Sequence, residues 1–140
     1  MAIDMHAHWR PAAMIDALRQ RTEDPRIFVN DEGVEVYKAR NGEVPVSEAF
    51  DDVETRLEEM DRQGITTAVL SLLSEHTWFE RLPLEESLPL VQLYNNSISE
   101  LCAEHAGRFT SLCSLPLADV DAAAAEFDRA MTLPGMVGAQ

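Results

Sequence analysis

Four short apolar runs recur along the 140-residue chain, and segments with helical spacing of apolar residues separate them. The runs are AIDMHAH at 2–8, ITTAVLSLLS at 65–74, FTSLCSLPL at 109–117 and MVGAQ at 136–140. Aliphatic and β-branched runs of this length are typical of buried strands. Strands that alternate with helices predict an α/β fold with a parallel sheet.

The segments between these runs predict four helices. The first covers residues 11–21, since proline is favoured in a first helical turn, and the second covers 50–63 and stops at Gly64. The third covers 89–105, and the fourth begins at Asp119 or Asp121 and ends before Pro134. Residues 22–50 lack helical periodicity, and within them VEVYKARNGEVPV predicts a hairpin with Asn41 and Gly42 in its turn.

The order of elements narrows the fold class further. No GxGxxG or GxxxxGK[ST] segment follows any predicted strand, which argues against nucleotide-binding doubly wound folds. A (β/α)8 barrel remains, although it typically needs about 250 residues. We therefore expect residues 1–140 to form one partial domain, the N-terminal half of a TIM barrel with four parallel strands and an inserted hairpin loop at 22–50.

Charge excludes several classes of partner. The net charge is −14, from 25 acidic and 11 basic residues, and no cluster of Lys or Arg interrupts it. Nucleic acid and anionic membrane surfaces would be repelled by such a chain. The N-terminus lacks the pattern of a signal peptide, and no apolar run approaches the ~20 residues of a membrane span. Cys102 and Cys113 have no motif spacing, so we expect two reduced cysteines in a cytoplasmic protein.

Two of the four histidines, His6 and His8, stand at the end of the first predicted strand. Residues at i and i+2 of a strand project from the same face, so both imidazoles can reach one zinc ion at about 2.0–2.1 Å. Active sites of α/β barrels lie at this end of the strands. Asp4 shares the same face one step deeper, where it is expected to be a hydrogen-bond partner behind the ligands. The alternative is a strand end with two exposed or hydrogen-bonded histidines that bind no metal.

Other residues are candidates for contact with a substrate. Trp9 and Arg10 follow the histidine pair directly, and Arg10 is suited to hold a carboxylate, although a solvated loop arginine is an equal alternative. His76 follows the second predicted strand and is either a pocket residue or an ordinary loop histidine. His105 lies in the last turn of a predicted helix, where its charge complements the helix dipole, so we interpret it as structural.

Five segments follow one another along the chain and, taken in this order, resemble a known family: IDMHAHWRP, RLEEMDRQGITTAVLS, LYNNSISELCAEHAGRFTSLCSLPL, DVDAAAAEFDRAM and PGMVGAQ. Together they resemble the amidohydrolase-2 branch of the amidohydrolase superfamily, above all the aminocarboxymuconate-semialdehyde decarboxylase-like enzymes. The resemblance runs over nearly the whole chain. HxH alone is a common motif, whereas the series NN…E…GRF…LPL…A…E is specific to this branch.

The resemblance implies a metal-dependent TIM-barrel enzyme that removes carboxylate groups from small aromatic or unsaturated acids, or hydrolyses related ring compounds. His6 and His8 would be two ligands of a divalent metal, zinc first and manganese second. In the family a later histidine and a late aspartate complete the metal site, and this chain has no counterparts of them. GEVPVSEAFDD also lacks the arginine that binds the substrate carboxylate in the decarboxylase, which leaves the substrate open.

Two functional hypotheses follow from the sequence. In the first, the chain is the N-terminal portion of a metal-dependent decarboxylase or hydrolase and is incomplete on its own. It is then either a fragment of that enzyme or one subunit of a split enzyme, in which a second chain or a further copy supplies the missing barrel half. In the second, it is a non-catalytic truncated half-barrel that associates with itself, with or without metal.

Overall fold

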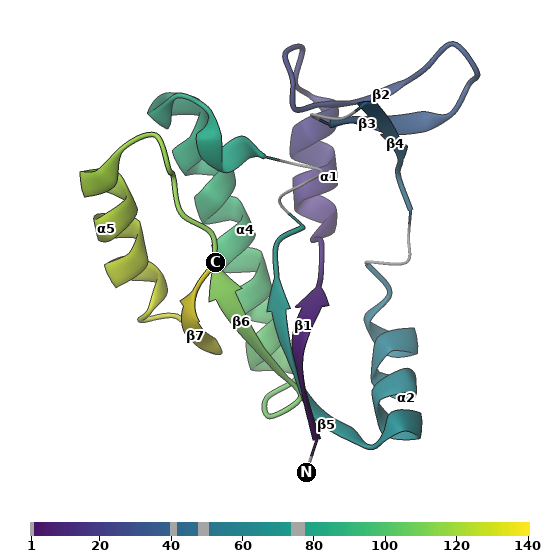
Figure 1. Ribbon diagram of the computed structural model, residues 1–140, viewed down its shortest axis with the longest axis vertical. Helices are drawn as coiled ribbons and strands as arrows, with labels where there is room; N and C mark the ends of the chain where they lie inside the picture. Colours follow the sequence, from purple (N-terminus) through teal and green to yellow (C-terminus); the bar gives the residue numbers. More distant parts are fainter. Residues whose placement is uncertain (1, 40–41, 48–50, 74–77) are drawn as a thin grey trace.

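The main sheet contains four parallel strands in the order β1-β5-β6-β7 (Figure 1). The computed structural model describes residues 2–39, 42–47, 51–73 and 78–140. The strands are β1 (Ala2–His8), β5 (Ile65–Ser71), β6 (Phe109–Cys113) and β7 (Met136–Ala139). The four predicted strands are therefore confirmed, and so is the α/β class with a parallel sheet.

In the described part of the chain, four α-helices and one 3-10 turn lie around this sheet. They are α1 (Ala12–Arg19), α2 (Val53–Gln63), η2 (Phe79–Arg81), α4 (Leu84–Glu104) and α5 (Val120–Ala130). Helix α4 packs on β6 and is flanked by α1 and α5, whereas α2 contacts β5 and lies beside the β1 edge of the sheet (Figure 1). No helix in the described part of the chain is long and apolar enough to cross a bilayer.

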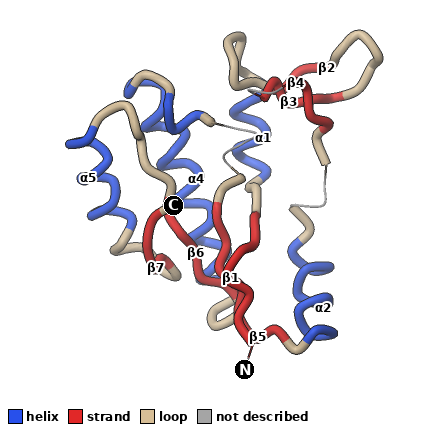
Figure 2. Tube along the Cα trace, viewed as in Figure 1, coloured by secondary structure: helices blue, strands red, loops and turns tan. Residues whose placement is uncertain are grey.

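A second, antiparallel sheet lies within residues 22–50. It contains β2 (Ile27–Val29), β3 (Glu35–Ala39) and β4 (Gly42–Pro45), and it sits beyond one end of α1 (Figure 2). The predicted hairpin is formed by β3 and β4, in which Lys38 pairs with Glu43. One of its two predicted turn residues, Asn41, lies outside the described residues. Strand β2 has no counterpart in the sequence prediction.

Two helix boundaries differ from the predictions. Helix α4 begins at Leu84, five residues before the predicted start at Pro89, which instead lies inside the helix. Pro83 is the residue that precedes the helix. Helix α2 begins at Val53, since the side chain of Asp52 caps it by accepting a hydrogen bond from the Thr55 N–H at 2.9 Å.

The core is built where the helices cover the main sheet. Its fully buried side chains include Leu70 of β5, Phe109 of β6, and Tyr94 and Ile98 of α4. Tight apolar packing of this kind fixes the strands relative to one another and so fixes the positions of their C-terminal ends. The strand ends are where the predicted site residues lie.

Candidate metal centre

The imidazole rings of His6 and His8 converge at the C-terminal end of β1. Their Nε2 atoms lie 3.1 Å apart, and the two rings meet edge to face with centroids 4.9 Å apart. His6 is exposed and His8 is partly buried, so the pair opens toward solvent. Two imidazole nitrogens at this separation either share a proton or converge on a common cation.

The backbone of β1 is irregular just before the pair. Its pairing with β5 changes register between Asp4 and Ala7, where two residues of β1 lie opposite one residue of β5. Asp4 Oδ1 accepts a hydrogen bond from the His6 backbone N–H at 3.0 Å. The carboxylate thus supports the bulged backbone and does not contact an imidazole ring. Bulges commonly re-aim side chains next to functional sites.

Ser71 at the end of β5 holds the second histidine. Its Oγ lies 3.2 Å from His8 Nδ1, and its carbonyl accepts a hydrogen bond from the Trp9 N–H at 3.3 Å. This contact suits the tautomer in which Nδ1–H donates to Ser71, which leaves the Nε2 lone pair free. Sequence reasoning missed Ser71, because a serine 63 positions away carries no local signal.

The histidine pair fits the demands of a divalent cation. Two ligands bound at 2.0–2.1 Å with angles between right and tetrahedral span about 2.9–3.4 Å, a range that includes the observed separation of the Nε2 atoms. A metal-bound histidine also typically donates its other ring N–H to a fixed partner, as the contact with Ser71 allows. Within the described residues, no group of three or more His, Cys, Asp or Glu side chains is arranged to hold a metal. The described chain therefore contributes two candidate ligands.

Arg10 is buried and engaged with the inserted segment. Its guanidinium donates two hydrogen bonds to Asp51, at 2.8 and 3.1 Å, and a third to the Ser47 carbonyl. It also stacks on the ring of Tyr37, with Cζ 5.1 Å from the centroid. These contacts tie the segment after β1 to the antiparallel sheet and to the approach to α2. With its donors occupied in this way, Arg10 does not present a free fork to a carboxylate.

The structure places the remaining candidates in different ways. Trp9 packs against the hydrophobic core. His105 ends α4, and its ring packs edge to face on Phe109, in keeping with the structural role expected of it. His76 lies outside the described residues. Of the six predicted site residues, the structure brings Asp4, His6 and His8 together.

Comparisons with known proteins agree with the fold. Gamma-resorcylate decarboxylase of Rhodococcus jostii is 37% identical over 91 residues, which is 64% of this chain and 27% of that protein. The crystal structure of 2,6-dihydroxybenzoate decarboxylase from Rhizobium matches 99% of this chain and 37% of its own, with 25% identity and a TM-score of 0.67. A dihydroxybenzoic acid decarboxylase from Polaromonas, with bound manganese and 2-nitroresorcinol, matches 99% of this chain and 37% of its own at 22% identity and a TM-score of 0.68.

No family model matches the chain. The matched segment spans about a quarter of the length of the curated decarboxylase. The predicted resemblance to amidohydrolase-2 decarboxylases is nevertheless confirmed, and the described fold corresponds to half of their TIM-barrel-like architecture.

Proposed function

We propose that this chain supplies His6 and His8 as ligands of a divalent metal in an enzyme that decarboxylates small aromatic carboxylic acids. The premise is that the chain corresponds to the N-terminal half of an amidohydrolase-2 decarboxylase fold. The observation that carries the proposal is the convergence of the two Nε2 atoms to 3.1 Å at the end of a parallel strand. The proposal is supported by two relatives, gamma-resorcylate decarboxylase and 2,6-dihydroxybenzoate decarboxylase, which act on aromatic acids.

The metal is proposed to be zinc or manganese. Imidazole nitrogen suits zinc well, whereas the Polaromonas relative binds manganese. A cation held by the pair would supply a Lewis acid next to the bound substrate. The histidine side chains would orient that cation, Ser71 would fix the ring of His8, and Asp4 would fix the backbone of His6.

Completion of the site is proposed to come from outside the described residues. Catalytic metal sites usually have three or more protein ligands, and the described chain arranges two. Further residues of the same protein, a second chain or a further copy of this one would bring the remaining ligands and close the barrel. Of the predicted substrate-lining residues Trp9, Arg10 and His76, the geometry gives Arg10 a different task, which is to anchor the inserted segment.

The reaction would replace a ring carboxylate with hydrogen. The bond between the ring carbon and the carboxylate carbon breaks, carbon dioxide leaves, and the ring carbon takes up one proton. A cytoplasmic location is part of the proposal, which the free state of both buried cysteines supports.

Metal loading tests the proposal directly. The purified protein, isolated in whatever assembly it forms, is titrated with Mn²⁺ and Zn²⁺ and assayed for release of carbon dioxide from 2,6-dihydroxybenzoate. We expect metal binding that a His6→Ala/His8→Ala variant abolishes and that the control variant His105→Ala retains. Metal binding that survives the double substitution would overturn the assignment of the ligands. Metal binding without turnover of any aromatic acid would favour the non-catalytic alternative.

A further inference from the structure

Arg56 occupies an unusual position on α2. Val53, Leu57 and Met60 form the apolar stripe of this helix, and Arg56 lies three residues after Val53 and four before Met60, on the same inward face. Charged side chains are rarely retained on a buried helix face unless they are paired. Burial lowers the pKa of the Arg56 guanidinium, and the nearby carboxylate of Asp4 opposes that shift.

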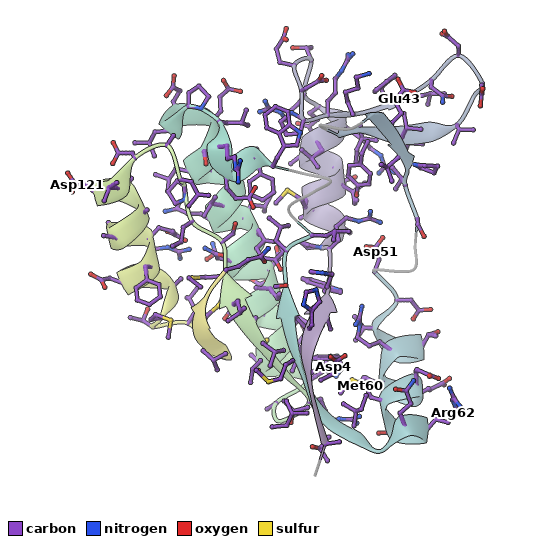
Figure 3. The ribbon with its side chains drawn as sticks, viewed as in Figure 1. Asp4, Glu43, Asp51, Met60, Arg62 and Asp121 are labelled. Atoms are coloured by element: carbon purple, nitrogen blue, oxygen red, sulfur yellow. The ribbon has the colours of Figure 1, made fainter. Side chains whose placement is uncertain are left out.

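The guanidinium reaches across to the strand that carries the histidine pair. Its Nη2 donates a hydrogen bond of 2.6 Å to the backbone carbonyl of His8. Figure 3 shows Asp4 on the side of β1 that faces α2, close to Met60, and Arg62 on the outer side of the same helix. An open cavity between the two elements is lined by Asp4, Thr55, Arg56 and Glu59, among others.

The direction of the His8 carbonyl explains why it needs this partner. The Trp9 N–H bonds to Ser71 on the β5 side, and successive residues of a strand direct their backbone groups to opposite sides. The carbonyl of His8 therefore points away from β5, and the N–H of His6, within the irregular part of β1, bonds to the Asp4 side chain instead of to β5. β1 is an edge strand of the described sheet, so no strand in the described structure satisfies these groups. Arg56 satisfies the carbonyl, and Asp4 satisfies the N–H.

We propose that Arg56 is a positioning residue that holds the His8 backbone through its carbonyl and thereby sets the separation of the His6 and His8 imidazoles. This inference rests on the proposed metal site. It assigns to α2, besides its packing, the positioning of the His8 backbone. The arginine and Asp4 act on opposite ends of the same three-residue segment. Ser71 fixes the His8 ring from the other side.

The test compares three variants of the full chain by NMR and by metal titration. Arg56→Gln removes the charge and shortens the donor arm, and Arg56→Lys retains the charge and one ammonium group on a long arm. Arg62→Gln is the matched control, because Arg62 is 73% exposed on the same helix and pairs only locally with Glu59 among the described residues. The readouts are the His8 carbonyl ¹³C shift, the ¹⁵N shifts of both imidazoles, and the dissociation constant for Mn²⁺.

We expect Arg56→Gln to move the His8 carbonyl signal and both sets of imidazole signals, and to weaken Mn²⁺ binding about 10- to 100-fold, the usual effect of removing a group that orients a metal ligand. Arg56→Lys should recover part of the affinity, and Arg62→Gln should match the unsubstituted chain. Unchanged histidine signals in Arg56→Gln would overturn the inference. So would unchanged Mn²⁺ affinity in that variant while His6→Ala/His8→Ala abolishes binding.

The two proposals fail in distinguishable ways. If Mn²⁺ binding is absent, or survives loss of both histidines, the metal assignment fails, while the NMR shifts still decide whether Arg56 sets the geometry of the pair. A thermal unfolding curve for each variant separates a local change from loss of the fold. If Arg56→Gln does not fold, the same NMR comparison is made on Arg56→Lys, whose unchanged histidine signals would equally overturn the inference.

Discussion

The side chain of Asn95 hydrogen-bonds to both the backbone carbonyl and the backbone N–H of Ser114. Its Nδ2 donates to the Ser114 carbonyl at 2.9 Å, and its Oδ1 accepts from the Ser114 N–H at 2.8 Å. Ser114 directly follows β6, so this pair of hydrogen bonds fixes the chain where it leaves the sheet. The Nδ2 also donates to Glu126 of α5 at 2.7 Å. One fully buried amide on α4 therefore joins a strand end to a second helix.

Asn95→Ala is expected to lower the free energy of unfolding by about 2–4 kcal/mol, because it leaves buried backbone groups of Ser114 without partners. The neighbouring Asn96 is the matched control, since it is exposed and contacts only Arg129 among the described residues. Asn96→Ala should cost less than about 1 kcal/mol. Urea unfolding of both variants measures the difference. Equal losses would show that the bridge to Ser114 contributes nothing particular.

Glu80 predicts a pH-dependent stability. It is 7% exposed, its Oε2 has no hydrogen-bond partner among the described residues, and burial raises its pKa above the usual value. An acid whose pKa rises on folding destabilises the folded state at pH values where it is ionised in both states. Glu80→Gln should therefore stabilise the protein at pH 7.5 by about 1 kcal/mol. The gain should vanish near pH 4, where both states bind the proton.

Thermal unfolding across this pH range measures the effect of Glu80→Gln. Glu85→Gln is the control, because Glu85 is exposed in the first turn of α4. A gain that stays constant down to pH 4 would argue for a packing effect instead of a titration.

Arg10→Lys is expected to loosen the inserted segment. A lysine cannot reproduce the paired bonds to Asp51 or the stacking on Tyr37, so we expect a loss of about 1–3 kcal/mol and faster proteolysis within residues 22–50. Arg26 offers a control, because it stacks on Phe28 and pairs with Asp24 at a half-buried position outside the contacts of Arg10. Arg26→Lys should change stability by less than about 0.5 kcal/mol. Protease digestion that is equally fast in both variants would contradict the anchoring role of Arg10.

Ser71→Ala tests the support of the His8 ring. Loss of the contact with Nδ1 should weaken Mn²⁺ binding about 10-fold and move the His8 ring signals, with little change in those of His105. Ser111→Ala is the control, since Ser111 is also buried, on β6, but contacts Met136. Isothermal titration calorimetry gives the affinities. The prediction is wrong if both serine variants bind Mn²⁺ alike.

Gly135→Ala should destabilise the fold strongly, by about 3 kcal/mol. The backbone there has a φ of +76°, and an added Cβ would lie 2.3 Å from Cys102 Cβ. Gly33 has nearly the same φ of +77° but open space around it. Gly33→Ala therefore isolates the conformational cost, about 1–2 kcal/mol, from the overlap. Chemical denaturation of the pair checks this difference, and equal losses would mean that Cys102 moves aside freely.

Local sequence signals were sufficient for the four main strands and the histidine pair. Each strand is an apolar run of its own, and His6 and His8 are only two residues apart. Strand β2 was missed because three residues hold no readable alternation and owe their conformation to pairing with β3. Ser71 and Arg56 were missed because they reach His8 from 63 and 48 positions away, and such contacts exist only after the sheet and α2 have assembled.

The strand that carries the histidines pairs with β5 alone among the described strands, so no described strand pairs with its outer side. Any strand that joins there would compete with Asp4 and Arg56 for the same backbone groups. If such pairing changes the affinity for the cation by some factor, the cation must change the affinity for the added strand by the same factor. Addition of a strand to the sheet and binding of the metal would then be coupled, each changing the equilibrium of the other.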